Sequence, residues 1–573
     1  MSTDGMMAIG GMRWTADGGA RQDEADLWCS YAAVRTLTWL GDKPADPDAV
    51  AAFLASRRNP DGGFAWQRGL PSDVWATYYC AQALGDLGVP VPQRDRLAAW
   101  VASTRTADGG FAMMPGQPAD IWATYYATRL YAEVLAAPVP DVDRLGGWLA
   151  ATQTGTGGLA WQPGSDQADT RAGYYGALAW RAAAADRPVP VRRAALVAWL
   201  RDRQAADGGF GFAPGAASCA WAAFRATRAL RALGAAPRDP DALHRWLDAR
   251  HRPDGGYERW PGYGVSDVWA CFSVVGALDA LGRPLAGAAG HGVADAVRGC
   301  QLPGSGFTYR SPAAASDSLA TAAALVLSAR PELADWLRRA QLPYEDGVMY
   351  MPGRGAEMRC TLWAASALST VDASLDAGRV RRWLVALQNV DGGYGYWHGR
   401  GSDLVSTVSA VELAAVSGLP VASTMDSGRL LRFLRGYRAG DDGYRPAAAS
   451  APTVAATAQA ARALAVLGET GEAVALAAAT DRWASPLGGY AATPRAVPDL
   501  LSTYQAVLTR QALGLGLDTG ALRRFLAKVR TAGGYAWSPL SRRAAGPLAA
   551  CLGAQLDRVA SADPAPPLLR LNL

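Results

Sequence analysis

The stretch Asp73-Val-Trp-Ala-Thr-Tyr-Tyr79 recurs along the chain with small changes. It returns almost unchanged as Asp120-Ile-Trp-Ala-Thr-Tyr-Tyr126. An Asp followed by an apolar run is typical of a helix start, because its carboxylate accepts hydrogen bonds from the free N–H groups of the first turn. We therefore expect a repeated helix that begins at this Asp. Looser copies begin at Asp26, Asp169, Asp267, Asp317, Asp403 and Asp499.

A glycine turn separates these helices at intervals of 43 to 51 residues. A period in this range predicts a repeat architecture, and it outranks any local assignment of secondary structure. Glycine suits chain reversals that need a positive φ. The twelve turn glycines are Gly18, Gly62, Gly109, Gly157, Gly208, Gly255, Gly304, Gly347, Gly392, Gly443, Gly488 and Gly533.

Each repeat reads as a pair of helices, and the expected fold class is all-α. The Asp-started helix ends near a Leu-Gly, and a second helix carrying a Trp-Leu or Phe-Leu pair runs to the next glycine turn. Twelve such hairpins divide into two tandem α/α barrels of six hairpins each. The Gly-, Ala- and Pro-rich segment 282–290 reads as the linker. We therefore predict one barrel over residues 1–285 and a second, more divergent one over residues 286–573.

Composition indicates a folded globular protein and excludes several classes of function. Of 573 residues, 50% are hydrophobic and 19% are charged, and the net charge of +5 shows no dense basic run, so nucleic acid is not an expected partner. Seven scattered cysteines without CxxC spacing predict reduced thiols in a cytoplasmic protein. No signal peptide or membrane span is expected. A peripheral contact with a membrane surface stays open, and the oligomeric state is not predicted.

The glutamine that precedes several of the glycine turns carries a family resemblance. Gln204-Ala-Ala-Asp-Gly-Gly-Phe210 and Gln388-Asn-Val-Asp-Gly-Gly-Tyr394, each behind a Trp-Leu helix, resemble the glutamine-to-aromatic (QW) repeats of squalene–hopene cyclases and related class II terpene cyclases. The same units are similar to the β-subunits of protein prenyltransferases. The resemblance covers nearly the whole chain, and it implies two α/α barrels and an isoprenoid ligand.

The catalytic motifs of these enzymes are missing from the sequence. No Asp-x-Asp-Asp occurs, which is the motif whose middle Asp protonates an alkene in class II cyclases. The Asp-Asp-x-x-Asp magnesium motif and the Asp-x-Cys zinc set are absent as well, so no metal site is predicted. The candidate acids are therefore nonstandard: Asp73, Asp120 and Asp267. Because this Asp recurs at most of the expected inner helices, each candidate also reads as a helix cap.

The residues that follow each Asp predict an aromatic face inside the first barrel. Rings at positions i, i+3 and i+4 lie on one side of a helix, and the inward sides of six helices converge on a common axis. Such rings could line a chamber that stabilises cations, or they could plug the barrel by stacking. Two arginines in this set need an anionic partner there, for which a diphosphate would serve. The predicted substrate-binding residues are Trp28, Trp75, Tyr78, Trp122, Tyr125, Arg171, Tyr174, Trp221, Arg225 and Trp269.

The equivalent positions of the second barrel are small and aliphatic. They leave open either a close-packed scaffold or a larger hollow. These positions are Leu319, Thr361, Val405, Ala455 and Leu501.

The resemblance implies a class II-type terpenoid cyclase that acts on a linear polyprenyl substrate, either a prenyl diphosphate or a squalene-like polyene. Its reaction would begin with protonation by a carboxylic acid. Two alternatives stay open: a prenyltransferase that uses a prenyl diphosphate donor, and a non-catalytic isoprenoid-binding protein. No cofactor is predicted with certainty, although Mg²⁺ is expected if the substrate carries a diphosphate.

Overall fold

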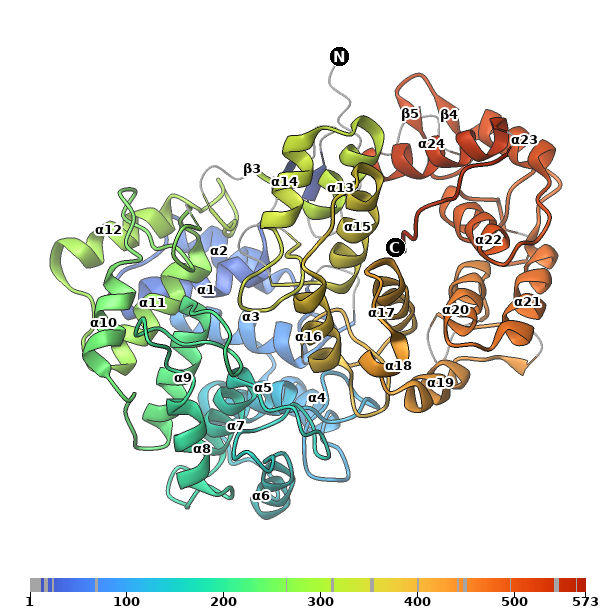
Figure 1. Cartoon of the computed structure of the whole chain (residues 1–573). Helices are drawn as coiled ribbons and strands as arrows, with labels where there is room; N and C mark the ends of the chain where they lie inside the picture. Colours follow the sequence, from blue (N-terminus) through green and yellow to red (C-terminus); the bar gives the residue numbers. More distant parts are fainter. Residues whose placement is uncertain are drawn as a thin grey trace. The chain divides into compact units, whose positions relative to one another are not determined.

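The computed structural model confirms the all-α prediction (Figure 1). It describes residues 12–14, 19–22, 25–66, 71–263, 265–310, 314–350, 355–398, 401–440, 443–446, 451–494, 496–540, 546–562 and 564–572. The chain forms two compact units. We call Gln22–Ala313 the N-terminal unit, and Met1–Arg21 together with Ala314–Leu573 the C-terminal unit.

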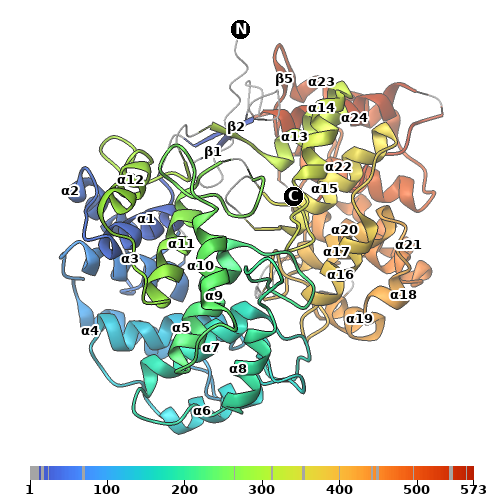
Figure 2. The ribbon, with the colours of Figure 1, turned by 60° about the vertical axis from the view of Figure 1, so that its left-hand side comes forward.

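The N-terminal unit is a closed ring of inner helices with a second ring of helices outside it, blue to green in Figure 2. Each inner helix contacts the next, and the last contacts the first. The inner helices are α1 (Leu27–Trp39), α3 (Val74–Asp86), α5 (Ile121–Arg129), α7 (Thr170–Ala183), α9 (Ala220–Ala232) and α11 (Val268–Ala280). The outer helices are α2 (Pro47–Ala55), α4 (Arg94–Ser103), α6 (Val142–Ala151), α8 (Arg193–Arg201), α10 (Pro240–Asp248) and α12 (Gly287–Arg298). A π-helical turn, η1 (Leu130–Val134), continues α5.

The C-terminal unit repeats this plan, and its inner ring also closes on itself. Its inner helices are α13 (Ser318–Ser328), α15 (Met358–Leu368), α17 (Leu404–Val416), α20 (Val454–Val466), α22 (Leu500–Ala512) and α24 (Pro547–Ser561). Its outer helices are α14 (Pro331–Arg339), α16 (Ala377–Leu387), α18 (Val421–Thr424), α19 (Ser427–Gly436), α21 (Thr470–Ala479) and α23 (Thr519–Val529). Short 3-10 turns are η2 (Ser369–Val371) and η4 (Thr480–Trp483).

Short strands complete the C-terminal unit. β1 (Met12–Trp14), β2 (Gly19–Gln22) and β3 (Ala314–Ser316) form one sheet in that order. β2 and β3 pair antiparallel, with Gly19 opposite Ser316. β4 (Arg530–Thr531) and β5 (Gly534–Tyr535) form a separate antiparallel pair. The start of the chain therefore belongs to the same unit as residues 314–573.

The boundary between the units differs from the predicted one at residues 285/286, because the N-terminal ring needs the segment that follows. α12 contacts both α1 and α11. Beyond it, the carbonyl of Phe307 accepts a hydrogen bond from the Asp26 N–H at 2.9 Å, and its own N–H donates to Ser30 Oγ at 2.9 Å. Residues 286–310 thus supply the last outer helix and the turn that precedes α1. The segment read as a linker lies inside the N-terminal unit, which ends at Ala313.

The glutamine of each QW-like turn joins neighbouring repeats. Gln204 Nε2 donates to the Gly208 carbonyl of its own turn at 3.1 Å and to the Asp239 carbonyl at 2.7 Å, and Gln204 Oε1 accepts from the Asp239 N–H at 2.9 Å. Asp239 is the N-cap of the next outer helix, α10. One side chain therefore fixes the turn and the start of the following helix together. Gln153, Gln301, Gln341 and Gln388 bond in the same manner.

The threonine four residues after the Asp ties the turn to the inner helix. Thr407 Oγ1 accepts a hydrogen bond from the Tyr394 N–H at 2.9 Å, and it donates to the Asp403 carbonyl at 2.7 Å. Both Thr407 and Tyr394 are fully buried. The same bond recurs at Thr77, Thr124, Thr361, Thr457 and Thr503. The repeated threonine of the sequence therefore has a structural role.

The turn glycines have the predicted positive φ in most of the described repeats, for example 98° at Gly62 and 88° at Gly392. A Cβ on Gly392 would lie 2.4 Å from the backbone carbon of Arg429, so no other residue fits without moving the next outer helix. In the repeat of Gly347 the positive φ of 70° falls instead on Asp346. Gly18 lies outside the described residues.

Replacing Thr407 by valine tests the turn-to-helix bond. The change keeps the side-chain shape but leaves the buried Tyr394 N–H without its acceptor. We expect the free energy of unfolding of Thr407→Val to fall by about 1–3 kcal/mol, measured by urea denaturation. Thr38→Val, at an exposed helix position, is the matched control and should change stability by less than about 0.5 kcal/mol. Equal losses in the two variants would contradict the assigned role.

Candidate functional site

The three candidate acids are N-caps of inner helices. Asp73 Oδ1 accepts from the Ala76 N–H at 2.8 Å, and Asp120 Oδ1 accepts from the Ala123 N–H at 2.7 Å. Asp267 Oδ1 accepts in the same way from Ala270 at 2.9 Å. The cap interpretation of these residues is thus correct for all three. The question that the sequence left open is whether one of them has a second role.

Asp267 has a free oxygen in addition to the capping one. Its Oδ2 is buried and accepts no hydrogen bond from the described residues, and the side chain as a whole is almost fully buried. Burial raises the pKa of this carboxyl above its ordinary value, and the charge of Arg259 offsets the rise only in part. Desolvation favours the neutral acid. Asp267 is therefore held toward the protonated form, which is the form that a proton donor needs.

A cavity of about 250 Å³ lies beside Asp267. The start of α11 forms one wall and the end of α12 forms the other, so both belong to the N-terminal unit. Its polar lining includes Asp254, Ser266 and Arg310, and Ser266 Oγ donates to Asp254 Oδ2 at 2.6 Å. Its thiol lining is Cys271 and Cys300; burial raises the pKa of Cys271, so that thiol stays protonated. This cavity was not predicted from the sequence, because the residues of α12 were assigned to the second barrel.

Aromatic rings pack around the first turn of α11, the helix that Asp267 caps. Trp269, two residues after Asp267, has a buried indole N–H with no hydrogen-bond partner among the described residues. Its ring contacts Trp28 at a centroid distance of 4.6 Å. The fully buried Arg259 lies with its guanidinium carbon 3.6 Å from the centre of the Trp221 ring. These rings pack against one another and against Arg259, and none of them lines the cavity beside Asp267.

The rings predicted to line a chamber fill the axis of the N-terminal ring. Trp75 and Trp122 lie 4.3 Å apart, and Tyr31 stacks on Tyr79 at 3.9 Å. Contacts also join helices that are not neighbours: Trp28 of α1 meets Trp221 of α9 at 5.6 Å. The structure thus favours packing over a chamber, and a substrate-binding role for this set stays a prediction. Trp28, Trp75, Tyr78, Trp122, Tyr125, Tyr174, Trp221 and Trp269 are all less than 10% exposed.

The two arginines do not form the predicted anion clamp. Arg171 makes a bidentate ion pair with Asp169, through Nε to Oδ1 at 2.9 Å and Nη2 to Oδ2 at 2.7 Å. Its charge is therefore balanced by the cap of its own helix. Arg225 donates to the Trp221 carbonyl at 3.2 Å and lies against the rings of Trp221 and Phe212. A diphosphate was expected here because a buried arginine needs an anionic partner. Arg171 already has one in Asp169, so this reason does not apply to it.

A polar cluster that sequence reasoning missed forms around the π-helical turn η1, with buried tyrosines and an exposed Glu133. Arg129 pairs with Glu133 and lies over the rings of Tyr78 and Tyr125. Tyr78 Oη donates to Glu133 at 2.9 Å, and the hydroxyls of Tyr125 and Tyr174 bond at 2.8 Å. The i, i+4 spacing of Arg129 and Glu133 was the available signal. The cluster provides hydrogen-bond partners for the buried hydroxyl groups of Tyr78, Tyr125 and Tyr174.

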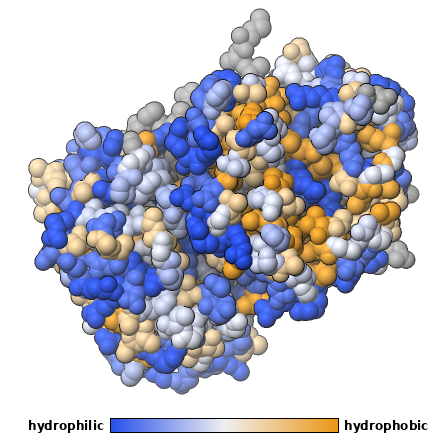
Figure 3. All heavy atoms as spheres, viewed as in Figure 1, coloured by the Kyte–Doolittle hydropathy of each residue, from blue (hydrophilic) through white to orange (hydrophobic). Residues whose placement is uncertain are grey.

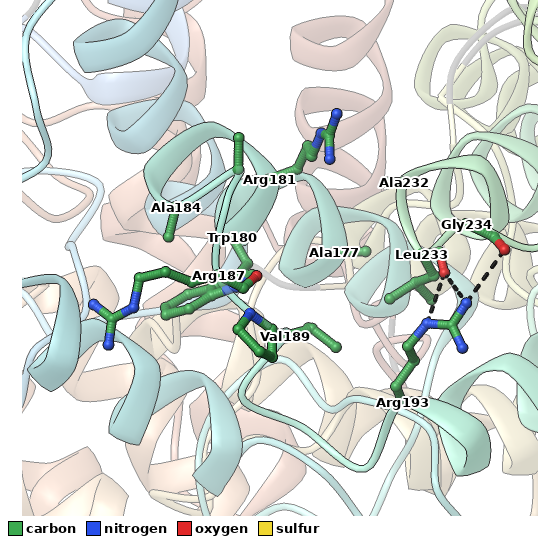
Figure 4. Close-up of a pocket in the computed structure, with 12 residues that line it drawn as sticks. Ala177, Trp180, Arg181, Ala184, Arg187, Val189, Arg193, Ala232, Leu233 and Gly234 are labelled. Carbon is green, nitrogen blue, oxygen red and sulfur yellow. Dashed lines mark hydrogen bonds between the residues drawn. The ribbon is translucent and has the colours of Figure 1, made fainter.

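A second cavity of about 270 Å³ lies among the ends of α7 and α9 and the start of α8 (Figure 4). Arg193 donates there to the carbonyls of Leu233 and Gly234, at 2.8 Å from Nε to the former. Figure 4 shows the guanidinium groups of Arg181 and Arg187 pointing away from that of Arg193. The three arginines therefore do not converge on an anion.

The described residues have neither a clustered set of metal ligands nor a membrane-spanning helix. They contain no group of three or more His, Cys, Asp or Glu side chains placed to hold a metal ion. Among the same residues, no helix has the length and apolar character required to cross a bilayer. Contact with a membrane surface stays a prediction.

Comparison with known proteins gives consistent matches. The family model described as the prenyltransferase alpha-alpha toroid domain matches residues 9–78, 67–259, 258–445 and 419–560. A drimenyl diphosphate synthase of Streptantibioticus cattleyicolor is 34% identical over 268 residues, which are 42% of this chain and 48% of the relative. The chain thus spans about half the length of that relative.

Solved structures with a similar helical arrangement have low sequence identity. An ent-copalyl diphosphate synthase from Streptomyces platensis is 16% identical, with 82% of this chain and 99% of that chain covered and a TM-score of 0.33. A Candida albicans protein geranylgeranyltransferase-I complexed with GGPP is 11% identical, with 42% and 83% covered and a TM-score of 0.35.

The pH dependence of stability tests the environment of Asp267. With a folded pKa above the unfolded value of about 3.9, the folded protein keeps a proton that the unfolded chain has released. The free energy of unfolding should therefore fall as pH rises through that window and level off above the folded pKa. Asp267→Asn keeps the cap but cannot titrate. We expect the stability of the wild type relative to Asp267→Asn to decrease as pH rises above about 4, measured by urea denaturation. An increase would contradict the assignment.

Proposed function

Because the chain belongs to the prenyltransferase α/α-toroid family, we propose that it is a class II-type terpenoid cyclase acting on a linear polyprenyl substrate. The substrate would be a prenyl diphosphate or a squalene-like polyene. Its similarity to a drimenyl diphosphate synthase over nearly half of the chain supports this assignment. The family alone does not fix the chemistry, so the proposal depends on a residue that can supply the proton.

The observation that carries the proposal is the state of Asp267. One carboxylate oxygen caps α11, and the other is buried beside a cavity with no hydrogen bond from the described residues. Burial holds the carboxyl toward its neutral form. A carboxylic acid that is held toward its neutral form at a residue lining a cavity suits general acid catalysis. Asp73 and Asp120 share the cap but do not line this cavity.

The reaction would begin with transfer of the Asp267 proton to the less substituted carbon of a trisubstituted double bond in the substrate. The alkene π electrons form the new C–H bond, which leaves a tertiary carbocation on the substrate and a carboxylate on Asp267. Attack by the next double bond closes a ring and moves the positive charge along the chain. Loss of a proton to a base ends the sequence, and Asp267 recovers its proton from solvent.

Product analysis with a matched pair of variants tests the proposal. The purified protein is incubated with farnesyl diphosphate, geranylgeranyl diphosphate and squalene, each with and without Mg²⁺. We expect a cyclic product, which keeps its diphosphate if the substrate carried one. Asp267→Asn should lower the rate by about 100-fold or more. Asp239→Asn, which replaces the exposed cap of α10, should retain the rate.

Other outcomes would identify the alternatives. Release of pyrophosphate with a prenylated acceptor would contradict cyclisation and favour a prenyltransferase. Saturable binding of the isoprenoid without any product would favour a non-catalytic binding protein. A cyclic product formed at an unchanged rate by Asp267→Asn would support the enzyme class but overturn the choice of acid, and Asp73→Asn and Asp120→Asn would then be compared.

A further inference from the structure

The last described segment of the chain lies inside the C-terminal unit. We call residues Pro566–Asn572 the strap; it follows α24, and Figure 1 shows the C-terminus within the ring of that unit. The side chains of Leu571 and Asn572 are fully buried. The strap therefore occupies interior space that the small inner residues of this ring leave open.

Side chains of the inner helices bind the main chain of the strap. Four successive carbonyl groups each accept a hydrogen bond from a different side chain, and those side chains come from α15 and α22. Hydrogen bonds to the main-chain groups of successive residues are typical of a protein that binds an extended peptide. The four bonds are Tyr504 Oη to Leu569 O at 2.8 Å, Ser366 Oγ to Arg570 O at 2.9 Å, Gln505 Nε2 to Leu571 O at 2.7 Å and Trp363 Nε1 to Asn572 O at 2.8 Å.

The side chain of Asn572 completes a buried ion pair. Arg462 Nε donates to Glu412 Oε1 at 2.6 Å, and both side chains are fully buried. Asn572 donates to Glu412 Oε2 at 2.8 Å and accepts from Arg462 Nη2 at 2.9 Å. Arg570 donates to Glu412 Oε1 at 3.1 Å. Without the strap, two buried charges would lose hydrogen bonds that they need in a low-dielectric interior.

The mouth of this ring has an apolar lining that the strap does not cover completely. Val405, Ala455 and Leu501 are half-buried, whereas Val408 and Ala458, one turn further along the same helices, are fully buried. Figure 3 shows apolar surface gathered over the C-terminal unit near α17, α20 and α22. Of the two interpretations left open for this ring, a hollow therefore fits better than a close-packed scaffold. The strap fills its deeper part.

We propose that the interior of the C-terminal unit is a binding site for an extended peptide, and that the strap is its resident, separable ligand. The ligand chemistry is an apolar segment with the pattern Leu-Leu-Arg-Leu-Asn. Specificity comes from Arg570 and Asn572 on the Glu412–Arg462 pair, and the main-chain carbonyls give affinity without sequence preference. This site is independent of the cavity beside Asp267, which lies in the other unit.

Cleavage of the folded full chain tests whether the strap is separable. A site-specific protease sequence is inserted after Ala562, and the purified protein is cut under native conditions. We expect the cut strap to co-elute with the body and to exchange with a fluorescent synthetic peptide of residues 564–572, at one peptide per chain. The readouts are gel filtration, fluorescence anisotropy, and circular dichroism of the body.

Peptide variants test the assigned contacts. A peptide with Asn572→Ala should bind about 10- to 100-fold more weakly, because it leaves hydrogen bonds to buried charges unmade. Pro567→Ala, at an exposed position of the strap, should bind like the parent peptide. Two results would overturn the proposal: a body that unfolds once the strap departs, or a folded body that does not take up the peptide. Equal binding of the Asn572→Ala and parent peptides would also overturn the assigned recognition.

Discussion

The glutamine amide at each QW-like turn is the interaction on which the fold depends. A single side chain, such as Gln204, satisfies a carbonyl of its own turn and both the N–H and the C=O of the next outer cap. Among the described residues, five glutamines fix their repeats to the next one in this way, and one of the five closes the N-terminal ring. Gln301 bonds to Asp46, 255 residues earlier in the chain. Because these bonds join turns to helix caps, the side chains that line the axis of the ring can differ without breaking them.

That tolerance explains how two similar rings came to have different interiors. In the N-terminal unit, stacked indoles and phenols fill the axis, and a cavity beside Asp267 lies between α11 and α12. In the C-terminal unit, small residues line the axis, and the strap occupies the space. The same scaffold thus holds an aromatic plug in one unit and a bound segment of the chain in the other.

Local features of the fold were predictable from the sequence, and its long-range closures were not. The Asp caps, the positive-φ glycines and the inner helices follow from short-range hydrogen bonding and sterics, which a stretch such as Asp73–Tyr79 encodes directly. The boundary was misplaced because the bond from Asp26 to Phe307 joins distant segments. Arg171 was expected to seek a ligand, but Asp169, two residues away, neutralises it. Asp267 could not be ranked above Asp73, since the two are both buried and differ in cavity contact rather than in motif.

The central functional claim is that the reaction begins with a proton delivered by Asp267. The most direct measurement is turnover in D₂O followed by mass spectrometry and NMR of the product. The account predicts one deuterium on the carbon that receives the initiating proton, and far less labelled product from Asp267→Asn. A cyclic product without deuterium, accompanied by free pyrophosphate, would show that ionisation rather than protonation starts the reaction, and it would contradict the account.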